Sequence, residues 1–369
     1  MSTARPARGE PIRVLDADGT VRDGATVPDL TDEELVDLYR ELYLARRFDR
    51  RTVKLNRQGR IGSFPPLYGH EAAQIGSAWA LDDADWVVPS YRDHGVLMTH
   101  GLNPAKILRY YMGIEDGNAI PEEVNAFPIN GSVGSQLPHA VGLAWSDRLR
   151  GDDGAAYVCY FGDGATSEGD VHEAMTFAGV FDTPNVFFCQ NNGWAISVPR
   201  ERQTAAETLA QKAAGYGFKG VRVDGMDPLA VYGVTREALE NAKDPDDGRL
   251  RPTFVEAVLY RLGAHSTADD PTKYRGDVPE KWQRRDPVPR FESFLLETGR
   301  LDDEGVTAIH DAVEADVSAA IDRAENADRP DPIGMFEHTF ESMPDRLAEQ
   351  ADLLRDLRER YGDDALAGE

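Results

Sequence analysis

The chain has 369 residues, 41% of them hydrophobic, which is enough apolar material for the core of one large domain or two average ones. Its formal net charge of -25 argues against nucleic acid as a partner, because an acidic surface repels phosphates. It contains no apolar run long enough to span a membrane, and the basic N-terminus lacks the apolar segment of a secretory signal. We therefore expect a cytoplasmic protein. The acidity fits ordinary solubility and also a halophilic protein adapted to a salt-rich cytoplasm.

The N-terminal part combines an irregular arm with two predicted helices. Residues 1–30 are rich in turn signals and are interpreted as the arm. Thr31 has Glu34 three residues later, a capping box, and the apolar spacing that follows predicts a helix to about residue 57. A second helix is predicted over residues 69–80.

The middle of the chain alternates apolar strands with helices. Strands are predicted around YVCYF, NVFFC, FKGVRV and PTFVEAV, and helical spacing occurs in EGDVHEAMTFAGVF and VYGVTREALENAK. This alternation predicts an α/β fold with a mostly parallel sheet, and continuously apolar strands indicate that both sheet faces are covered, in three layers. Cys159 and Cys189 lie inside two of these strands and are interpreted as buried, reduced thiols.

The C-terminal part begins with a polar, proline-rich stretch at residues 263–290, which we interpret as a functional or disordered loop. Helical patterns follow in FESFLLETG, at 302–326 and at about 344–360. The predicted organisation is an arm (1–30), an α/β domain (31–300) and a C-terminal helical extension (301–369).

Two strand ends in the middle region carry polar residues suited to a metal. The strand YVCYF ends in Gly162-Asp163-Gly164, and NVFFCQ ends in Asn191-Asn192. In parallel sheets, ligands bind at the carboxyl ends of strands, and one β-α-β crossover would bring these two ends together. A carboxylate, an amide oxygen and a backbone carbonyl suit Mg²⁺ when phosphate oxygens and water complete the octahedron. A Gly-Asp-Gly turn alone is a weak signal, but its spacing to Asn-Asn after a second strand favours the metal site over two unrelated turns.

These segments resemble the thiamine diphosphate signature, and the chain is similar to the alpha subunit of the decarboxylating component of 2-oxo acid dehydrogenase complexes. The resemblance extends over about residues 30–340 and includes PSYRDHG, GSVGSQLPHAVG, VRVDGMDPLAVY and AHSTADDPTKYR. It implies the three-layer thiamine diphosphate-binding fold. It also implies that the chain, with a beta subunit, decarboxylates a 2-oxo acid on the cofactor and passes the acyl group to a lipoyl domain.

The resemblance further implies specific roles for residues of this chain. Mg²⁺ would be bound by Asp163, Asn192 and the carbonyl of Trp194. The cofactor would be contacted by Tyr91, Arg92, Gly131, Val133, Gly162, Asp163, Gly164, Ala165, Asn192, Trp194 and His265. Val133 would hold the cofactor in a bent shape, and Gly164 and Ala165 would offer N–H groups to its diphosphate. His265, Tyr91 and Arg92 would be the catalytic residues, with His265 exchanging protons at the reacting centre.

Some positions of this region depart from the family pattern or allow two interpretations. His70 stands in GHEA where many relatives have glutamine or glutamate, and Ser63 stands where relatives often carry an aromatic residue at the substrate pocket. Asp170 and Glu173 either favour the start of a helix or line a polar path between two active sites. Ser266 matches a residue that is phosphorylated in some relatives, but nothing in the sequence indicates regulation.

The resemblance also implies partners, because the glutamate that activates the cofactor belongs to a second domain that we do not find here. We expect two alpha and two beta chains, with a lipoyl acyltransferase as the next component. The substrate is pyruvate or a branched-chain 2-oxo acid, and an acetoin dehydrogenase alpha subunit is the alternative. A non-catalytic scaffold is disfavoured because the implied ligands are present, and a Rossmann dinucleotide-binding protein is disfavoured because no GxGxxG follows an early strand.

Overall fold

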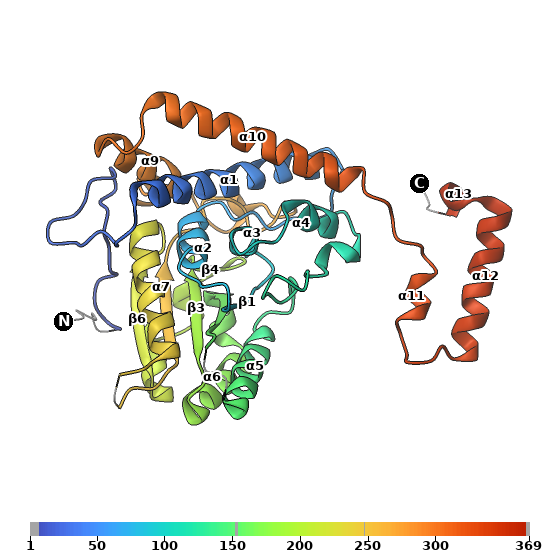
Figure 1. Cartoon of the computed structure of the whole chain (residues 1–369), viewed down its shortest axis with the longest axis horizontal. Helices are drawn as coiled ribbons and strands as arrows, with labels where there is room; N and C mark the ends of the chain where they lie inside the picture. Colours follow the sequence, from blue (N-terminus) through green and yellow to red (C-terminus); the bar gives the residue numbers. More distant parts are fainter. Residues whose placement is uncertain (1–6, 152–153, 247, 367–369) are drawn as a thin grey trace. The chain divides into compact units, whose positions relative to one another are not determined.

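The computed structural model describes residues 7–151, 154–246 and 248–366 (Figure 1). The chain forms two compact units, Met1–Ala324 and Glu325–Glu369, which we describe separately. The domain boundaries expected after residues 30 and 300 remain predictions. Within the described residues no helix is both long and apolar enough to cross a membrane.

The first unit is built on a five-stranded parallel sheet with the strand order β1-β2-β3-β7-β6. The strands are β1 (Trp86–Val88), β2 (Tyr157–Gly162), β3 (Asn185–Asn191), β6 (Lys219–Asp224) and β7 (Thr253–Val258). A two-stranded antiparallel hairpin, β4 (Trp194–Ala195) and β5 (Val198–Pro199), follows β3. The α/β fold with a mostly parallel central sheet is therefore confirmed.

Alternate side chains of the strands enter two separate hydrophobic cores. Tyr160 and Phe188 point into the core shared with α1, α2 and α7, whereas Phe161 and Phe187 point into the core shared with α5 and α6. Cys159 and Cys189 are buried in the second core as free thiols, as expected. Because both sheet faces are covered, the strands are apolar throughout, and the three layers are confirmed.

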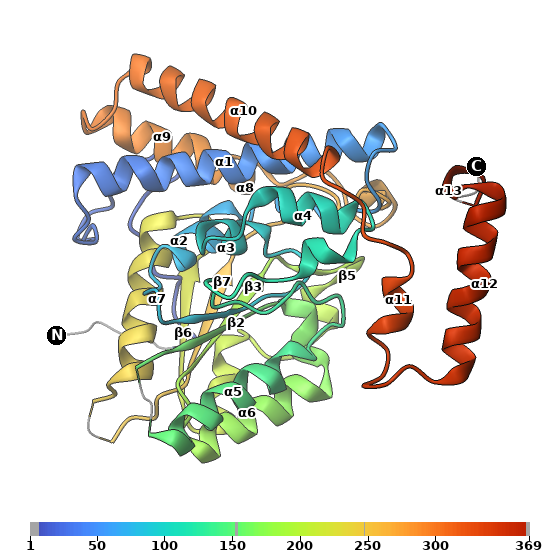
Figure 2. The ribbon, with the colours of Figure 1, turned by 45° about the vertical axis from the view of Figure 1, so that its right-hand side comes forward.

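Helices cover both faces of the sheet in the first unit (Figure 2). The α-helices are α1 (Asp32–Arg57), α2 (Glu71–Ala78), α3 (His94–Thr99), α4 (Pro104–Tyr111), α5 (Gln136–Arg150), α6 (Gly169–Phe181), α7 (Pro228–Lys243), α8 (Glu280–Gln283), α9 (Pro287–Glu297) and α10 (Asp303–Glu325). The 3₁₀ helices are η1 (Glu115–Asn118), η2 (Asp163–Ser167), η3 (Arg200–Arg202), η4 (Ala210–Tyr216) and η5 (Pro271–Lys273).

The start of α1 has the predicted capping box. The Glu34 N–H donates to Thr31 Oγ1 at 3.2 Å, and the Thr31 N–H donates to the Glu34 carboxylate at 2.7 Å.

Helix α10 runs alongside α1 (Figures 1 and 2), where Tyr43 stacks on His310 with ring centroids 3.8 Å apart. The stretch 263–290 is more ordered than the predicted loop, because it contains η5, α8 and the first turn of α9.

The second unit is helical, with α11 (Gly334–Glu337), α12 (Asp345–Tyr361) and α13 (Asp363–Leu366). Arg358 of α12 forms ion pairs with Asp331 at 2.7 Å and with Asp363 at 2.6 Å. These exposed pairs join the helix to the segments on either side of it.

Candidate functional site

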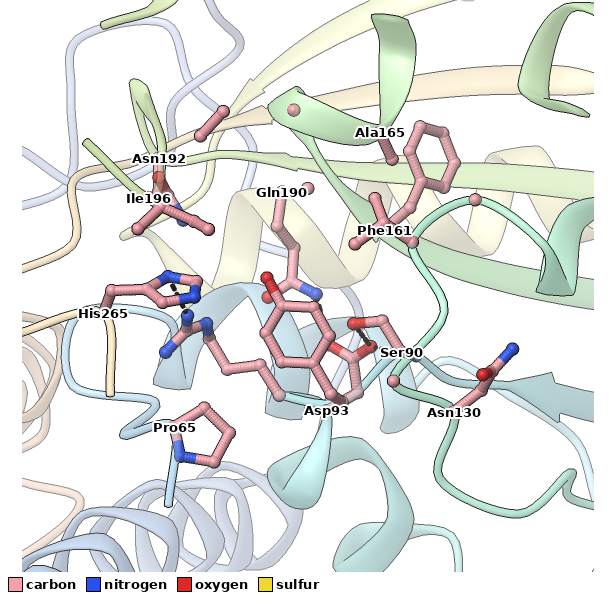
Figure 3. A pocket seen from close by; sticks show the side chains of 18 of the residues that line it. Pro65, Ser90, Asp93, Asn130, Phe161, Ala165, Gln190, Asn192, Ile196 and His265 are labelled. Atoms are coloured by element: carbon pink, nitrogen blue, oxygen red, sulfur yellow. Dashed lines mark hydrogen bonds between the residues drawn. The ribbon is translucent and has the colours of Figure 1, made fainter. Parts of the chain in front are cut away.

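The carboxyl ends of β1, β2, β3 and β7 meet at one edge of the sheet and surround a cavity of about 570 Å³ (Figure 3). Adjacent parallel strands end at the same edge, so residues far apart in the sequence converge there. The cavity is lined by every residue that the resemblance implied as a cofactor or metal contact: Tyr91, Arg92, Gly131, Val133, Gly162, Asp163, Gly164, Ala165, Asn192, Trp194 and His265.

The two side chains among the three implied metal ligands, Asp163 and Asn192, lie next to each other. The register pairs Gly162 of β2 with Gln190 of β3, which places the residues that follow both strands side by side. The Asn192 N–H donates to Asp163 Oδ1 at 3.3 Å, and the Trp194 N–H donates to Asn192 Oδ1 at 3.1 Å. The Asp163 carboxylate therefore contacts the backbone of Asn192, and both residues line the cavity.

The surroundings of Asp163 suit a divalent cation. Its side chain is buried, and burial raises the pKa of its carboxyl, while a hydrogen bond from Gln203 Nε2 at 2.9 Å opposes that rise. No lysine or arginine of the described residues forms an ion pair with it. Gln203 Oε1 is buried and has no hydrogen-bond partner among the described residues, so it would be free to accept from a water bound to the metal. The donor set fits Mg²⁺, whose remaining positions phosphate and water can fill.

The glycine turn after β2 has no room for a side chain. A Cβ added to Gly164 would lie 2.8 Å from the Cβ of Ala195, in the hairpin that follows Asn192. The turn continues as η2, and α6 begins at Gly169. Because Gly164 lacks a Cβ, the turn after β2 and the hairpin after β3 pack closely beside the cavity.

The turn after β1 holds Tyr91 and Arg92 against the cavity. Asp93 stabilises this turn, since its Oδ2 accepts from the N–H and hydroxyl of Ser90, both at 2.7 Å. The Arg92 guanidinium is nearly buried and donates to the Pro66 carbonyl at 2.5 Å and to His265 Nδ1 at 3.1 Å. Figure 3 shows His265, Ser90 and Asp93 around the cavity.

The ring of His265 is held as a neutral hydrogen-bond donor. Its Nδ1 faces two guanidinium groups that can only donate, Arg92 at 3.1 Å and Arg261 at 3.3 Å. Burial, Arg92 and Arg261 lower the pKa of His265 to about 4. The single proton of the neutral ring is therefore on Nε2.

The residues in and around the cavity that were not predicted from the sequence include Arg261, Gln203 and Ile196. Arg261 is fully buried and donates to the Ile196 carbonyl at 2.8 Å as well as to His265. Ile196 has a φ of 54°, which is strained for a β-branched residue, and it lines the cavity as a residue that is 56% exposed. A signal for Arg261 was its position four residues before His265, directly after an apolar strand. We find no such signal for Gln203 or Ile196.

The remaining sequence-predicted residues divide between the cavity and the surface. Ser63, His70 and Ser266 line the cavity, and Val133 is 48% exposed within it. Asp170 and Glu173 are exposed on α6 and do not line the cavity, so a polar path through them stays a prediction.

Comparison with known proteins shows to which class this fold and site belong. A family model described as "Dehydrogenase E1 component" matches residues 39–333. The chain is 40% identical over 349 residues to the pyruvate dehydrogenase E1 component subunit alpha of Staphylococcus aureus, covering 94% of this chain and 93% of that protein. The protein of the same name from Staphylococcus epidermidis gives the same identity and coverage. The chain therefore belongs to the dehydrogenase E1 component family, as an alpha subunit of a thiamine diphosphate-dependent 2-oxo acid dehydrogenase.

Proposed function

We propose that this chain binds the diphosphate of thiamine diphosphate through Mg²⁺ and, together with a beta chain, decarboxylates pyruvate. The observation that carries the proposal is the single cavity onto which all the implied contact residues open. Asp163, Asn192 and the Trp194 carbonyl would hold the ion. Gly164 and Ala165 would offer their N–H groups to the diphosphate, and Arg92 and Tyr91 would border it.

Bound thiamine diphosphate would supply a nucleophilic ring carbon and an electron sink for loss of CO₂. The chain's own residues would orient the cofactor and protonate the reacting oxygen. The exposed side chain of Val133 would support the bent cofactor from one side of the cavity. His265 would donate the proton on Nε2 to the reacting oxygen, since Arg92 and Arg261 keep Nδ1 as an acceptor.

Pyruvate is favoured as substrate because the two Staphylococcus relatives bear that substrate in their names. Ser63, which the resemblance places at the substrate pocket, lines the cavity together with Pro65 and Tyr111. Branched-chain 2-oxo acids and acetoin are the alternatives. The proposed assembly contains two alpha and two beta chains, and a lipoyl acyltransferase would take the acyl group.

The test compares the purified chain with its complex. The chain alone should show no 2-oxo acid decarboxylation, and adding the beta chain, Mg²⁺ and thiamine diphosphate should restore it. Pyruvate, 3-methyl-2-oxobutanoate and acetoin are assayed side by side. Robust turnover by the chain alone, or a preference for acetoin by the complex, would contradict the proposal.

A further inference from the structure

His70 is a buried histidine that touches one of the proposed metal ligands. It is the N-cap residue of α2, it lines the cavity, and only 1% of it is exposed. Its Nε2 lies 3.1 Å from Asn192 Nδ2, and its Nδ1 lies 3.1 Å from the Leu67 carbonyl oxygen. The ring thus connects the backbone of the segment before α2 to the amide that follows β3.

The donor and the acceptor of each hydrogen bond in this connection follow from two backbone groups, the Leu67 carbonyl at one end and the Trp194 N–H at the other. The Leu67 carbonyl can only accept, so His70 Nδ1 carries the proton. At the other end, the Trp194 N–H can only donate, so the Asn192 atom that faces it at 3.1 Å is the oxygen. The amide NH₂ of Asn192 then points at His70, whose unprotonated Nε2 accepts from it.

We propose that His70 is a positioning residue for the metal site, which together with the Trp194 N–H holds the Asn192 amide with its oxygen turned toward the cation; this inference rests on the proposed function. The ring does not touch the ion. It acts through the acceptor that it offers to the NH₂ group of Asn192. A reversed amide would present two N–H donors to a divalent cation, which would remove one ligand.

The chemistry of the contact makes a selective prediction about substitutions. His70→Leu keeps an apolar volume but removes the acceptor, and it leaves a buried NH₂ of Asn192 unpaired. His70→Gln keeps an acceptor, because its side-chain carbonyl can receive the same hydrogen bond. Loss of a partner that orients a metal ligand typically weakens metal binding about 10-fold to 100-fold.

The experiment measures Mn²⁺ binding by electron paramagnetic resonance. It uses the full chain in complex with its beta chain and saturating thiamine diphosphate. His70→Leu should raise the Mn²⁺ dissociation constant about 10-fold to 100-fold, whereas His70→Gln should stay within about threefold of the wild type, well under the loss expected for a missing ligand partner. The matched control is His100→Leu, because His100 is a half-buried histidine that does not line the cavity. This control should leave the Mn²⁺ dissociation constant unchanged. Unfolding temperatures measured without metal separate folding defects from binding defects.

The outcomes distinguish the inference from the function on which it rests. If the wild-type complex does not bind Mn²⁺, the proposed function fails. If it does and His70→Leu binds equally well, or His70→Gln binds as weakly as His70→Leu, the role of His70 fails. Should His70→Leu not fold, ¹⁵N resonances of histidine-labelled wild-type complex, assigned by their loss in His70→Gln, decide instead. A His70 ring protonated on Nδ1 supports the inference, and one protonated on Nε2 overturns it.

Discussion

Replacing Asp163 by asparagine should separate ligand binding from the stability of the fold. The side chain is buried, and burial raises the pKa of its carboxyl, so the metal-free protein has to bury a charge without a cationic partner. Asp163→Asn removes that charge at nearly constant volume. Gln203 can rotate so that its unpaired Oε1 accepts from the new amide. The free energy of unfolding without ligand should therefore change by less than about 1 kcal/mol, or increase.

The effect on cofactor binding should be large. Loss of an outer partner of a metal ligand already costs about 10-fold to 100-fold in affinity, so loss of the carboxylate itself should cost at least about 100-fold. At a ligand concentration of about 100 times the wild-type dissociation constant, binding stabilises the wild type by about 2.7 kcal/mol. The variant at the same concentration would gain only about 0.4 kcal/mol or less.

Two quantities are measured by thermal unfolding of the complex with the beta chain. Scans without Mg²⁺ and thiamine diphosphate give the stability of the fold, and scans with them give the stabilisation by ligand binding. The wild type should show a ligand-dependent rise in unfolding temperature, and Asp163→Asn should show almost none. Asp163→Glu, which keeps the charge, is the comparison variant. A full ligand-dependent shift in Asp163→Asn, or a metal-free unfolding temperature lowered as strongly as by a core truncation, would contradict the proposed role of Asp163.

Three further predictions concern the proton donor, the outer partner of the carboxylate and the core. His265→Asn should lower kcat of the complex by about 10²-fold to 10⁴-fold while Mn²⁺ affinity stays unchanged, because in the proposed mechanism the ring would move a proton and would hold no metal; activity within tenfold of the wild type would count against it. Since the pKa of His265 is lowered from 6.5 to about 4, protonation favours the unfolded state, and the stability present above pH 6.5 is lost as the pH falls toward 4. In denaturant unfolding, the free energy of unfolding of His265→Asn should therefore fall less steeply with pH in that window than that of the wild type. Gln203→Leu should weaken Mn²⁺ binding about 10-fold, and an unchanged dissociation constant would remove Gln203 from the site. Phe188→Ala, in the fully buried strand β3, should cost about 3–5 kcal/mol in urea unfolding, and a cost below about 1 kcal/mol would contradict the packing described here.

Much of the fold could be predicted because its signals are local. The capping box at Thr31 and Glu34 and the apolar spacing after it predict α1 from residues that touch one another along the chain. The strands β2 and β3 are visible as apolar runs because both of their sheet faces are buried. The short strand β1 was not predicted, since three residues are too few to show a period.

The class of the sheet and the two polar strand ends that carry Asp163 and Asn192 could be predicted from the sequence, because strand periodicity and turn chemistry depend on neighbours in the chain. Which side chains surround those ends depends on how distant segments pack. His70 reaches Asn192 from 122 positions away, and Arg261 and Arg92 meet at His265 from different strand ends. These contacts follow from the order β1-β2-β3-β7, and hydrogen-bond direction depends on three-dimensional placement that no local pattern encodes.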